Sequence, residues 1–106
     1  MDAGKTILFS DMDGTLLNSE SQVSPRDRAA IEDYIGRGGR FAISTGRQPQ
    51  NALLYLPNIP LNAPSVVLNG AAVYDYGTGL YSHTRFLRRE LSDPVLRRCL
   101  REIPGL

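Results

Sequence analysis

The sequence predicts an α/β fold built on a parallel β-sheet, and three observations support this prediction. Short apolar segments alternate with segments of helical periodicity, in the order strand, helix, strand, helix, strand. A polar cluster directly follows each apolar segment. The length of 106 residues suffices for one small domain. We therefore expect a parallel half-sheet with flanking helices and right-handed crossover connections.

The first strand and the first helix have clear sequence signals. Residues 6–10 form an apolar run with acidic residues just beyond it, which predicts a buried strand. Ser24 and Pro25 predict the start of a helix, because serine is a favoured N-cap and proline a favoured first helical residue. Apolar residues follow at helical spacing, at Ala30, Ile31, Tyr34 and Ile35. Gly38 and Gly39 predict the end of this helix.

The next three elements are shorter. Residues 40–44 predict a second strand, residues 49–56 a weaker helix closed by prolines, and residues 65–68 a third strand. The three strands are followed by Asp-Met-Asp, Thr-Gly-Arg and Asn-Gly, respectively. Ligands of open α/β sheets bind beyond the carboxyl ends of the strands, so we expect these clusters to meet at one edge of the sheet.

The last part of the chain has a different pattern. Residues 71–75 and 80–83 flank the sequence Tyr-Gly-Thr-Gly, which predicts a β-hairpin with glycines where positive φ angles are needed. Apolar residues at helical spacing from position 90 or 91 to position 103 predict a final helix, which Pro104 and Gly105 end. A hairpin and a helix therefore follow the predicted half-sheet.

The composition indicates no particular partner. The chain has 42% hydrophobic and 22% charged residues, and its formal net charge is +1. Residues 1–84 carry 6 basic and 8 acidic side chains, whereas residues 85–106 carry 6 basic and 3 acidic ones. This basic segment has no series of interleaved aromatic residues, so we expect a solvated helix face and no nucleic-acid partner.

The sequence predicts a cytoplasmic protein without a membrane partner. Cys99 is the only cysteine, so no disulfide can form within the chain. It lies in a helical segment without a nearby histidine, and we expect a spectator and not a nucleophile. No apolar stretch approaches the length that spans a bilayer, and the N-terminus lacks the apolar core of a secretory signal.

Asp11 and Asp13 are the candidate catalytic residues. They stand at the end of the first predicted strand, where two like charges cost free energy unless a metal ion or a reaction uses them. Helix or turn capping would explain one of them. A strand-end carboxylate can instead bind a divalent cation and attack phosphorus, while a second one protonates the leaving oxygen and later activates water. In an extended backbone both side chains would point to the same side.

The segment Asp-Met-Asp-Gly-Thr-Leu-Leu at residues 11–17 resembles the first signature of the haloacid dehalogenase-like phosphohydrolases, whose core is Rossmann-like. The resemblance implies Asp11 as nucleophile and Mg²⁺ ligand. It implies Asp13 as general acid/base, with its backbone carbonyl also on the metal. A Mg²⁺ cofactor would offset the repulsion between the carboxylates and a phosphate.

A second segment is similar to the same family. Phe-Ala-Ile-Ser-Thr-Gly-Arg at residues 41–47 looks like the second signature. The similarity implies that Thr45 and the Gly46 N–H contact the phosphoryl group, with Ser44 as the alternative if the register shifts by one residue. Arg47 fits a phosphate or substrate contact, because a guanidinium suits oxyanions. A surface arginine near a helix start is the alternative interpretation of Arg47.

A third segment, residues 66–75, is similar to the third strand of one subgroup, the Cof-type sugar-phosphate phosphatases. This similarity implies that Asn69 faces the active site, although an ordinary Asn-Gly turn would also explain the residue. The family resemblance also places Met12 among the phosphate- or substrate-binding residues. The three segments together connect the predicted strand ends to phosphoryl transfer.

The chain departs from the family pattern in two respects. The family uses a lysine that steadies the nucleophile and the phosphate, but the only lysine is Lys5, before the first strand. It also uses an acidic pair of the Gly-Asp-x-x-Asn-Asp kind to complete the metal site, and no such pair follows residue 83. We therefore expect residues 1–84 to be the N-terminal part of the phosphatase core domain. Residues 85–106 are expected to be the connection and the first helix of a truncated cap domain.

The predicted function is Mg²⁺-dependent hydrolysis of small phosphorylated metabolites, such as sugar phosphates, through an aspartyl-phosphate intermediate. A phosphomannomutase-like phosphotransferase would share the first signature and is one alternative. A catalytically inactive binding or assembly fragment is the other. We expect the 106-residue chain alone to be weakly active or inactive. Its incomplete sheet would expose apolar surface and favour self-association.

Overall fold

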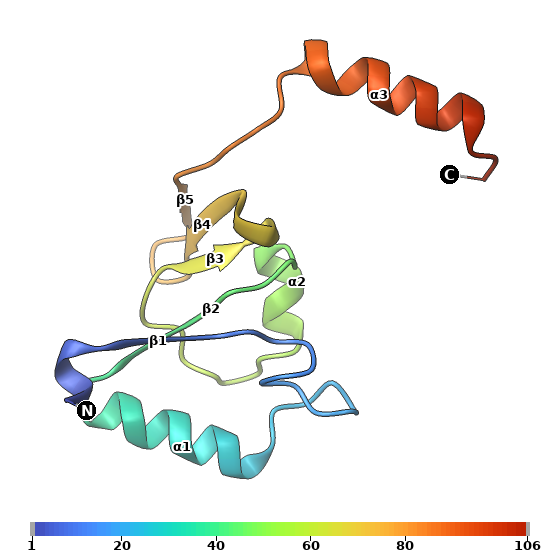
Figure 1. Cartoon of the computed structure of the whole chain (residues 1–106). Helices are drawn as coiled ribbons and strands as arrows, with labels where there is room; N and C mark the ends of the chain where they lie inside the picture. Colours follow the sequence, from blue (N-terminus) through green and yellow to red (C-terminus); the bar gives the residue numbers. More distant parts are fainter. Residues whose placement is uncertain (1, 106) are drawn as a thin grey trace.

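The structure, a computed structural model, describes residues 2–105 (Figure 1). The elements follow one another in the order η1 (Ala3–Lys5), β1 (Ile7–Ser10), α1 (Pro25–Gly36), β2 (Arg40–Ile43), α2 (Pro49–Leu54), β3 (Ser65–Val67), η2 (Leu68–Gly70), β4 (Ala72–Asp75), β5 (Leu80–Ser82) and α3 (Arg89–Glu102). This order confirms the predicted alternation of strands and helices. It also confirms the hairpin and the final helix.

The parallel part of the sheet consists of β1, β2 and β3. β1 pairs with β2 from Ile7 opposite Arg40 to Ser10 opposite Ile43. β2 is joined to β3 by a single parallel bridge between Ser44 and Val66, just beyond the end of β2. The three strands therefore run in the same direction, and the polar residues that follow them lie at a common edge, as predicted.

The hairpin continues this arrangement in the antiparallel sense. β4 pairs with both β3 and β5, so the second sheet has the order β3, β4, β5. The turn between β4 and β5 uses Gly79 at a φ of 72°, a conformation that glycine adopts without steric cost. The carboxylate of Asp75 accepts a hydrogen bond from the Gly77 N–H at 2.7 Å, which closes the turn. The hairpin glycine thus has the predicted role.

The hydrophobic core is centred on β2. Phe41, Ala42 and Ile43 are almost completely buried, which makes β2 the inner strand of the structure. Phe41 and Ile43 share one apolar cluster with Met12 from the loop after β1 and Ile31 from α1. Burial of these side chains holds the loop after β1 against the strand that carries the next polar cluster.

β1 departs from the prediction of a buried strand. Ile7, Leu8 and Phe9 are 45%, 47% and 48% exposed, on both faces of the strand. Within residues 2–105, β1 pairs with β2 on one side only, so it is an edge strand. The prediction of burial was wrong because an apolar run specifies burial only where other segments cover it. The prediction that the incomplete sheet exposes apolar surface is confirmed.

The start of α1 confirms the predicted cap. The Ser24 hydroxyl accepts a hydrogen bond from the Asp27 N–H at 3.1 Å, and Pro25 occupies the first helical position. Asp27 adds a negative charge to the first turn, where the helix dipole is positive. After the helix, Gly38 has a φ of 92° and turns the chain into β2.

Tyr34 fastens the end of α1 to the sheet. Its hydroxyl donates to the Thr6 carbonyl oxygen at 3.0 Å and lies 2.8 Å from the Thr6 hydroxyl. Its ring lies over Gly39, where an added Cβ would be 2.5 Å from two of the ring carbons. Only a residue without a Cβ therefore fits beneath the ring.

α3 stands apart from the other elements (Figure 1). None of its residues is buried, and its apolar side chains Leu91, Val95, Leu96 and Leu100 are all more than half exposed. The segment that leads to it is anchored by a hydrogen bond from the Arg85 N–H to the Ala71 carbonyl at 2.7 Å. In the part of the chain from residue 2 to residue 105, no helix is long and apolar enough to cross a membrane.

We expect Gly39→Ala to lower the free energy of unfolding by about 1–3 kcal/mol, because the new methyl group overlaps the Tyr34 ring. Gly36→Ala is the matched control, since no atom lies within 4 Å of its added Cβ. Alanine there is expected to be neutral or to stabilise α1 by up to about 1 kcal/mol. Urea denaturation followed by circular dichroism measures both values. Equal effects of the two substitutions would contradict the role given to the ring.

The exposed edge of β1 leads us to expect self-association of the 106-residue chain as its concentration rises. Leu8→Lys should reduce it, because a lysine on an edge strand opposes pairing with another chain. Leu54→Lys removes the same side chain from an exposed position on α2 and should have little effect. Light scattering measures the average mass. A monodisperse wild-type monomer with a sharp thermal transition would contradict this expectation.

Candidate active site

The loop after β1 turns back on itself directly after the strand. The Leu16 N–H donates to the Asp11 carbonyl at 3.2 Å, and the Leu17 N–H donates to the Met12 carbonyl at 2.8 Å. Gly14 has a φ of 78°, which the turn requires. Met12 is fully buried, backbone included, so it presents almost no surface to a ligand, although the family resemblance placed it among the phosphate- or substrate-binding residues. The backbone is therefore turned and not extended between the two aspartates and the residues after them.

Asp11 opens on a hollow at the carboxyl ends of the parallel strands. The hollow has a volume of about 340 Å³, and its lining residues are Asp11, Ser44, Thr45, Gly46, Asn69 and Gly70. It brings together four of the predicted site residues, one or two from each polar cluster. The Asp11 carboxylate accepts one weak hydrogen bond, from the Thr15 hydroxyl at 3.4 Å, and Asp11 and Thr15 also line a second hollow beside β1.

Thr45 is held rigidly at the end of β2. Only 6% of the residue is exposed, and its N–H donates to the Val66 carbonyl at 3.0 Å. Its hydroxyl oxygen accepts the Arg47 N–H at 3.1 Å. Because the hydroxyl is an acceptor in this bond, its own O–H remains able to donate to a ligand. Ser44, the predicted phosphoryl contact if the register shifts by one residue, also lines the hollow but is exposed.

Asn69 lies against the loop after β2. Its N–H donates to the Thr45 carbonyl at 3.1 Å, and its φ of 54° places it in the left-handed region, which asparagine tolerates. A Cβ added to Gly46 would lie 2.7 Å from the Asn69 Oδ1. Because Gly46 has no Cβ, the Asn69 side chain can lie against Thr45 and Gly46, the residues predicted to contact the phosphoryl group.

Asp13 lies in a different environment from Asp11. Arg47 donates to both of its carboxylate oxygens, from Nε at 2.9 Å and from Nη2 at 2.8 Å. These hydrogen bonds are the main cause that lowers the pKa of Asp13 below its ordinary value, and they raise the pKa of Arg47. The structure thus joins the predicted acid/base to a predicted substrate contact. Asp13 does not line the hollow of Asp11.

The Arg47 pair has a chemical consequence for Asp13. A carboxylate whose pKa is lowered stays ionised at neutral pH and is a weaker base than a free one, so the pair with Arg47 opposes proton uptake by Asp13. To protonate a leaving oxygen it must first lose the two hydrogen bonds from Arg47. The geometry therefore links any acid role of Asp13 to the separation of the Asp13–Arg47 pair.

Mg²⁺ fits the Asp11 side of this site better than the Asp13 side. Proteins often bind Mg²⁺ through one or two carboxylates, while water and substrate phosphate complete the octahedron. The Asp11 carboxylate has no cationic partner among the ion pairs of residues 2–105, whereas both carboxylate oxygens of Asp13 face Arg47. In this described range no group of three or more His, Cys, Asp or Glu side chains could hold a metal ion.

Two residues of α2 and its end, Asn51 and Tyr55, were not predicted from the sequence. The Asn51 Oδ1 accepts a hydrogen bond from Arg47 Nη1 at 2.6 Å. The guanidinium carbon of Arg47 lies 4.1 Å from the centre of the Tyr55 ring. Positions 47, 51 and 55 are spaced by four residues, so the helical period could have identified them as neighbours.

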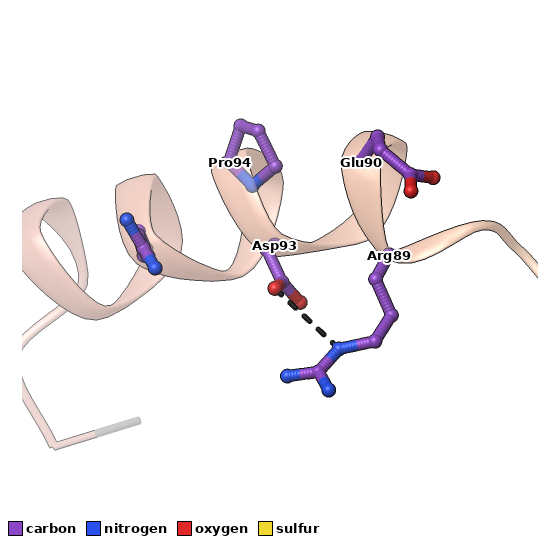
Figure 2. Close-up of a pocket in the computed structure, with 5 residues that line it drawn as sticks. Arg89, Glu90, Asp93 and Pro94 are labelled. Atoms are coloured by element: carbon purple, nitrogen blue, oxygen red, sulfur yellow. Dashed lines mark ion pairs between the residues drawn. The ribbon is translucent and has the colours of Figure 1, made fainter.

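A hollow of similar size lies on α3, as Figure 2 shows. Its volume is about 350 Å³, and it is lined by Arg89, Glu90, Asp93, Pro94 and Arg97. All of these residues belong to one exposed helix, and Arg89 and Asp93 form an ordinary ion pair of 3.6 Å along it. The hollow is therefore a surface feature of a single helix and far from the strand ends.

The comparisons with known proteins agree with this geometry. Residues 8–96 match the sequence profile of the haloacid dehalogenase-like hydrolases, so the chain belongs to this family. A 5-amino-6-(5-phospho-D-ribitylamino)uracil phosphatase of Bacillus subtilis, YwtE, is 38% identical over 74 residues, which are 70% of this chain and 25% of that protein. A chloroplastic endoribonuclease of Arabidopsis thaliana, YBEY, is 36% identical over 76 residues, or 63% of this chain and 13% of that protein.

Solved structures give the same family likeness. A haloacid dehalogenase-like hydrolase from B. subtilis superposes with a TM-score of 0.75 at 26% identity, over 91% of this chain and 33% of that one. A phosphatase of the same superfamily from Bacteroides thetaiotaomicron has a TM-score of 0.76 at 24% identity, over 88% of this chain and 34% of that one, and shows the fold alone. The chain spans about a quarter or less of these two curated relatives and about a third of these structures.

The Asp13–Arg47 pair leads to a prediction about pH. We expect the Asp13 carboxyl to titrate below its ordinary value, and Arg47→Met to move the midpoint upward, because the two hydrogen bonds are lost. The folded-state pKa is the lower one, so the pair stabilises the fold above about pH 4 and this stabilisation is lost as the pH falls through the folded-state pKa.

Carbon-13 NMR of the Asp13 carboxyl group measures this midpoint. Arg37→Met is the control, because it removes an arginine of the exposed ion pair with Asp33 and leaves Asp13 untouched. A midpoint for Asp13 that is the same in the wild type and in Arg47→Met would show that the ion pair does not persist in solution.

Proposed function

We propose that this chain carries the nucleophile of a Mg²⁺-dependent phosphatase that hydrolyses small phosphorylated metabolites. The observation that supports the proposal is the hollow at the strand ends, which Asp11 lines together with Thr45 and Gly46. A carboxylate nucleophile opposite hydrogen-bond donors is the arrangement that phosphoryl transfer needs. The family and the phosphatase relatives agree with this chemistry.

In the proposed reaction, an oxygen of the Asp11 carboxylate attacks phosphorus, the bond to the leaving oxygen breaks, and an aspartyl phosphate forms. Water then attacks the phosphorus of this intermediate and releases inorganic phosphate and the free carboxylate. The Thr45 O–H and the Gly46 N–H donate hydrogen bonds to the phosphoryl oxygens as charge develops on them. When bound at Asp11, Mg²⁺ would supply charge that offsets the repulsion between carboxylate and phosphate.

Asp13 and Arg47 complete the proposed mechanism. Arg47 binds an anionic group of the substrate and the Asp13 carboxylate leaves the ion pair, so that Asp13 can take up the proton that the leaving oxygen needs. Asp13 then takes a proton from the attacking water in the second step. The ion pair of the free site therefore keeps Asp13 ionised until a substrate arrives.

The size and the chemistry of the hollow support the proposed substrate class. Its volume of about 340 Å³ suits a phosphomonoester of metabolite size, and sugar phosphates belong to this class. The phosphatase relative YwtE is named for a substrate with a phosphorylated ribityl chain. A cytoplasmic location and the division into a core segment, residues 1–84, and the beginning of a cap, residues 85–106, are parts of the same proposal.

A catalytically inactive binding fragment is the second candidate. Two observations favour it for the 106-residue chain. Both carboxylate oxygens of Asp13 are occupied by Arg47, and residues 2–105 contain no three-residue group that could hold a metal ion. Such a fragment would bind phosphate in the hollow without turning it over.

The proposal is tested by Asp11→Asn in the full-length protein, with p-nitrophenyl phosphate and Mg²⁺. Loss of the nucleophile should lower kcat by at least about 10³-fold. Asp33→Asn, at an exposed position of α1 that faces Arg37, should leave kcat unchanged. Full activity of Asp11→Asn would show that another residue attacks phosphorus. If the wild-type 106-residue chain binds phosphate but does not hydrolyse p-nitrophenyl phosphate, the result favours the binding fragment for this chain.

A further inference from the structure

The guanidinium of Arg47 is held on three sides, and two of the contacts come from residues without an assigned role. Asp13 accepts from Nε and Nη2, and Asn51 accepts from Nη1 at 2.6 Å. The face of the guanidinium lies on the Tyr55 ring, at 4.1 Å from its centre. A free arginine side chain has many rotamers, so this arrangement costs entropy that the contacts must offset.

We propose that Asn51 and Tyr55 are positioning residues, which fix Arg47 in the orientation that serves both Asp13 and an anionic group of the substrate. The inference rests on the proposed function, because the phosphorylated substrate of that function is the ligand of the fixed guanidinium. It adds two residues of the α2 segment to a site that otherwise consists of strand-end loops.

The exposure of the partners shows which one is fixed. The Arg47 side chain is 24% exposed, whereas the Asp13 side chain is 57% exposed. Tyr55 packs against the hydrophobic core, and α2 begins at the buried Pro49. The guanidinium is thus attached to a packed helix, and the carboxylate of Asp13 approaches it from an exposed turn.

The remaining donors of Arg47 identify the ligand. A guanidinium carries five N–H donors in a rigid plane. Three of these are used by the hydrogen bonds to Asp13 and Asn51, so two remain, one on each terminal nitrogen. Two donors in a fixed plane match the oxygens of a phosphate or a carboxylate. Asn51 and Tyr55 therefore prearrange Arg47 for an oxyanion.

A role of Asn51 and Tyr55 in folding alone would have different consequences. Asn51 is exposed, and the hydrogen bond with Arg47 is the side-chain hydrogen bond that it forms within residues 2–105. Its replacement should therefore leave the core intact. Gln50 is its exposed neighbour on α2 and makes no contact with Arg47. A substitution at position 50 therefore controls for any general effect on the helix.

The test uses the NMR signal of the Arg47 Nε–Hε group in the 106-residue chain, assigned by its loss in Arg47→Lys. Hydrogen exchange of this group with water should become about threefold faster or more in Asn51→Leu, the factor expected when one such contact is lost. Gln50→Leu should leave it unchanged. Tyr55→Leu should accelerate it as well, while Tyr55→Phe, which keeps the ring beneath the guanidinium, should restore the wild-type rate.

Titration with inorganic phosphate gives the second measurement. Asn51→Leu should weaken phosphate binding severalfold, whereas Gln50→Leu should not. An exchange rate in Asn51→Leu equal to that of the wild type, with an unchanged circular dichroism spectrum, would overturn the inference. If Tyr55→Leu unfolds, Asn51→Leu alone decides. If phosphate shifts neither the Arg47 nor the Gly46 signal of the wild type, the proposed function fails, and the exchange rates still decide the positioning role.

Discussion

The structure depends on the burial of β2. Phe41, Ala42 and Ile43 are almost inaccessible to water, and burial of apolar side chains such as these is the dominant favourable term in folding. Because β2 lies between β1 and β3, its burial also brings the three loops beyond these strands together. Met12 extends the same core into the loop after β1, so packing helps to place the residues on either side of it. The reactive edge of the sheet is a consequence of the core.

Two kinds of interaction then divide the site. On the Asp11 side, backbone hydrogen bonds between residues 45–47 and 66–69 hold the loop with Thr45 and Gly46 in place. Within residues 2–105 the Asp11 carboxylate forms no ion pair with a basic side chain and accepts one weak hydrogen bond from Thr15. On the Asp13 side, a charged pair holds the carboxylate, and the α2 segment holds the charge that pairs with it. The first side is rigid and open to a ligand. On the second side, the proposed acid role of Asp13 would require its pair with Arg47 to separate first.

Local signals in the sequence predicted most of the elements, because caps, glycines and periodicity act over a few residues. The Ser24 cap, the glycine turn of the hairpin and the strand-end clusters are examples. The exposure of β1 could not be read from its apolar residues, since burial depends on which other segments cover a strand. The pairing of Asp13 with Arg47 joins positions 34 residues apart, and no local pattern encodes it. Asn51 and Tyr55 follow Arg47 at a helical spacing of four residues, but this spacing indicates a shared site only once the position of the Arg47 guanidinium is known.

The close approach of Asn69 to Gly46 has a consequence for how this site can vary. The two residues come from different loops, and the side chain of one occupies the space that a side chain on the other would need. A larger residue at position 46 therefore requires the Asn69 side chain to turn away or to be replaced by a smaller one. The two positions are coupled by volume, so the effect of a change at one depends on the residue at the other. Both residues line the hollow beside Asp11, so a change at either position is expected to alter the shape of the hollow.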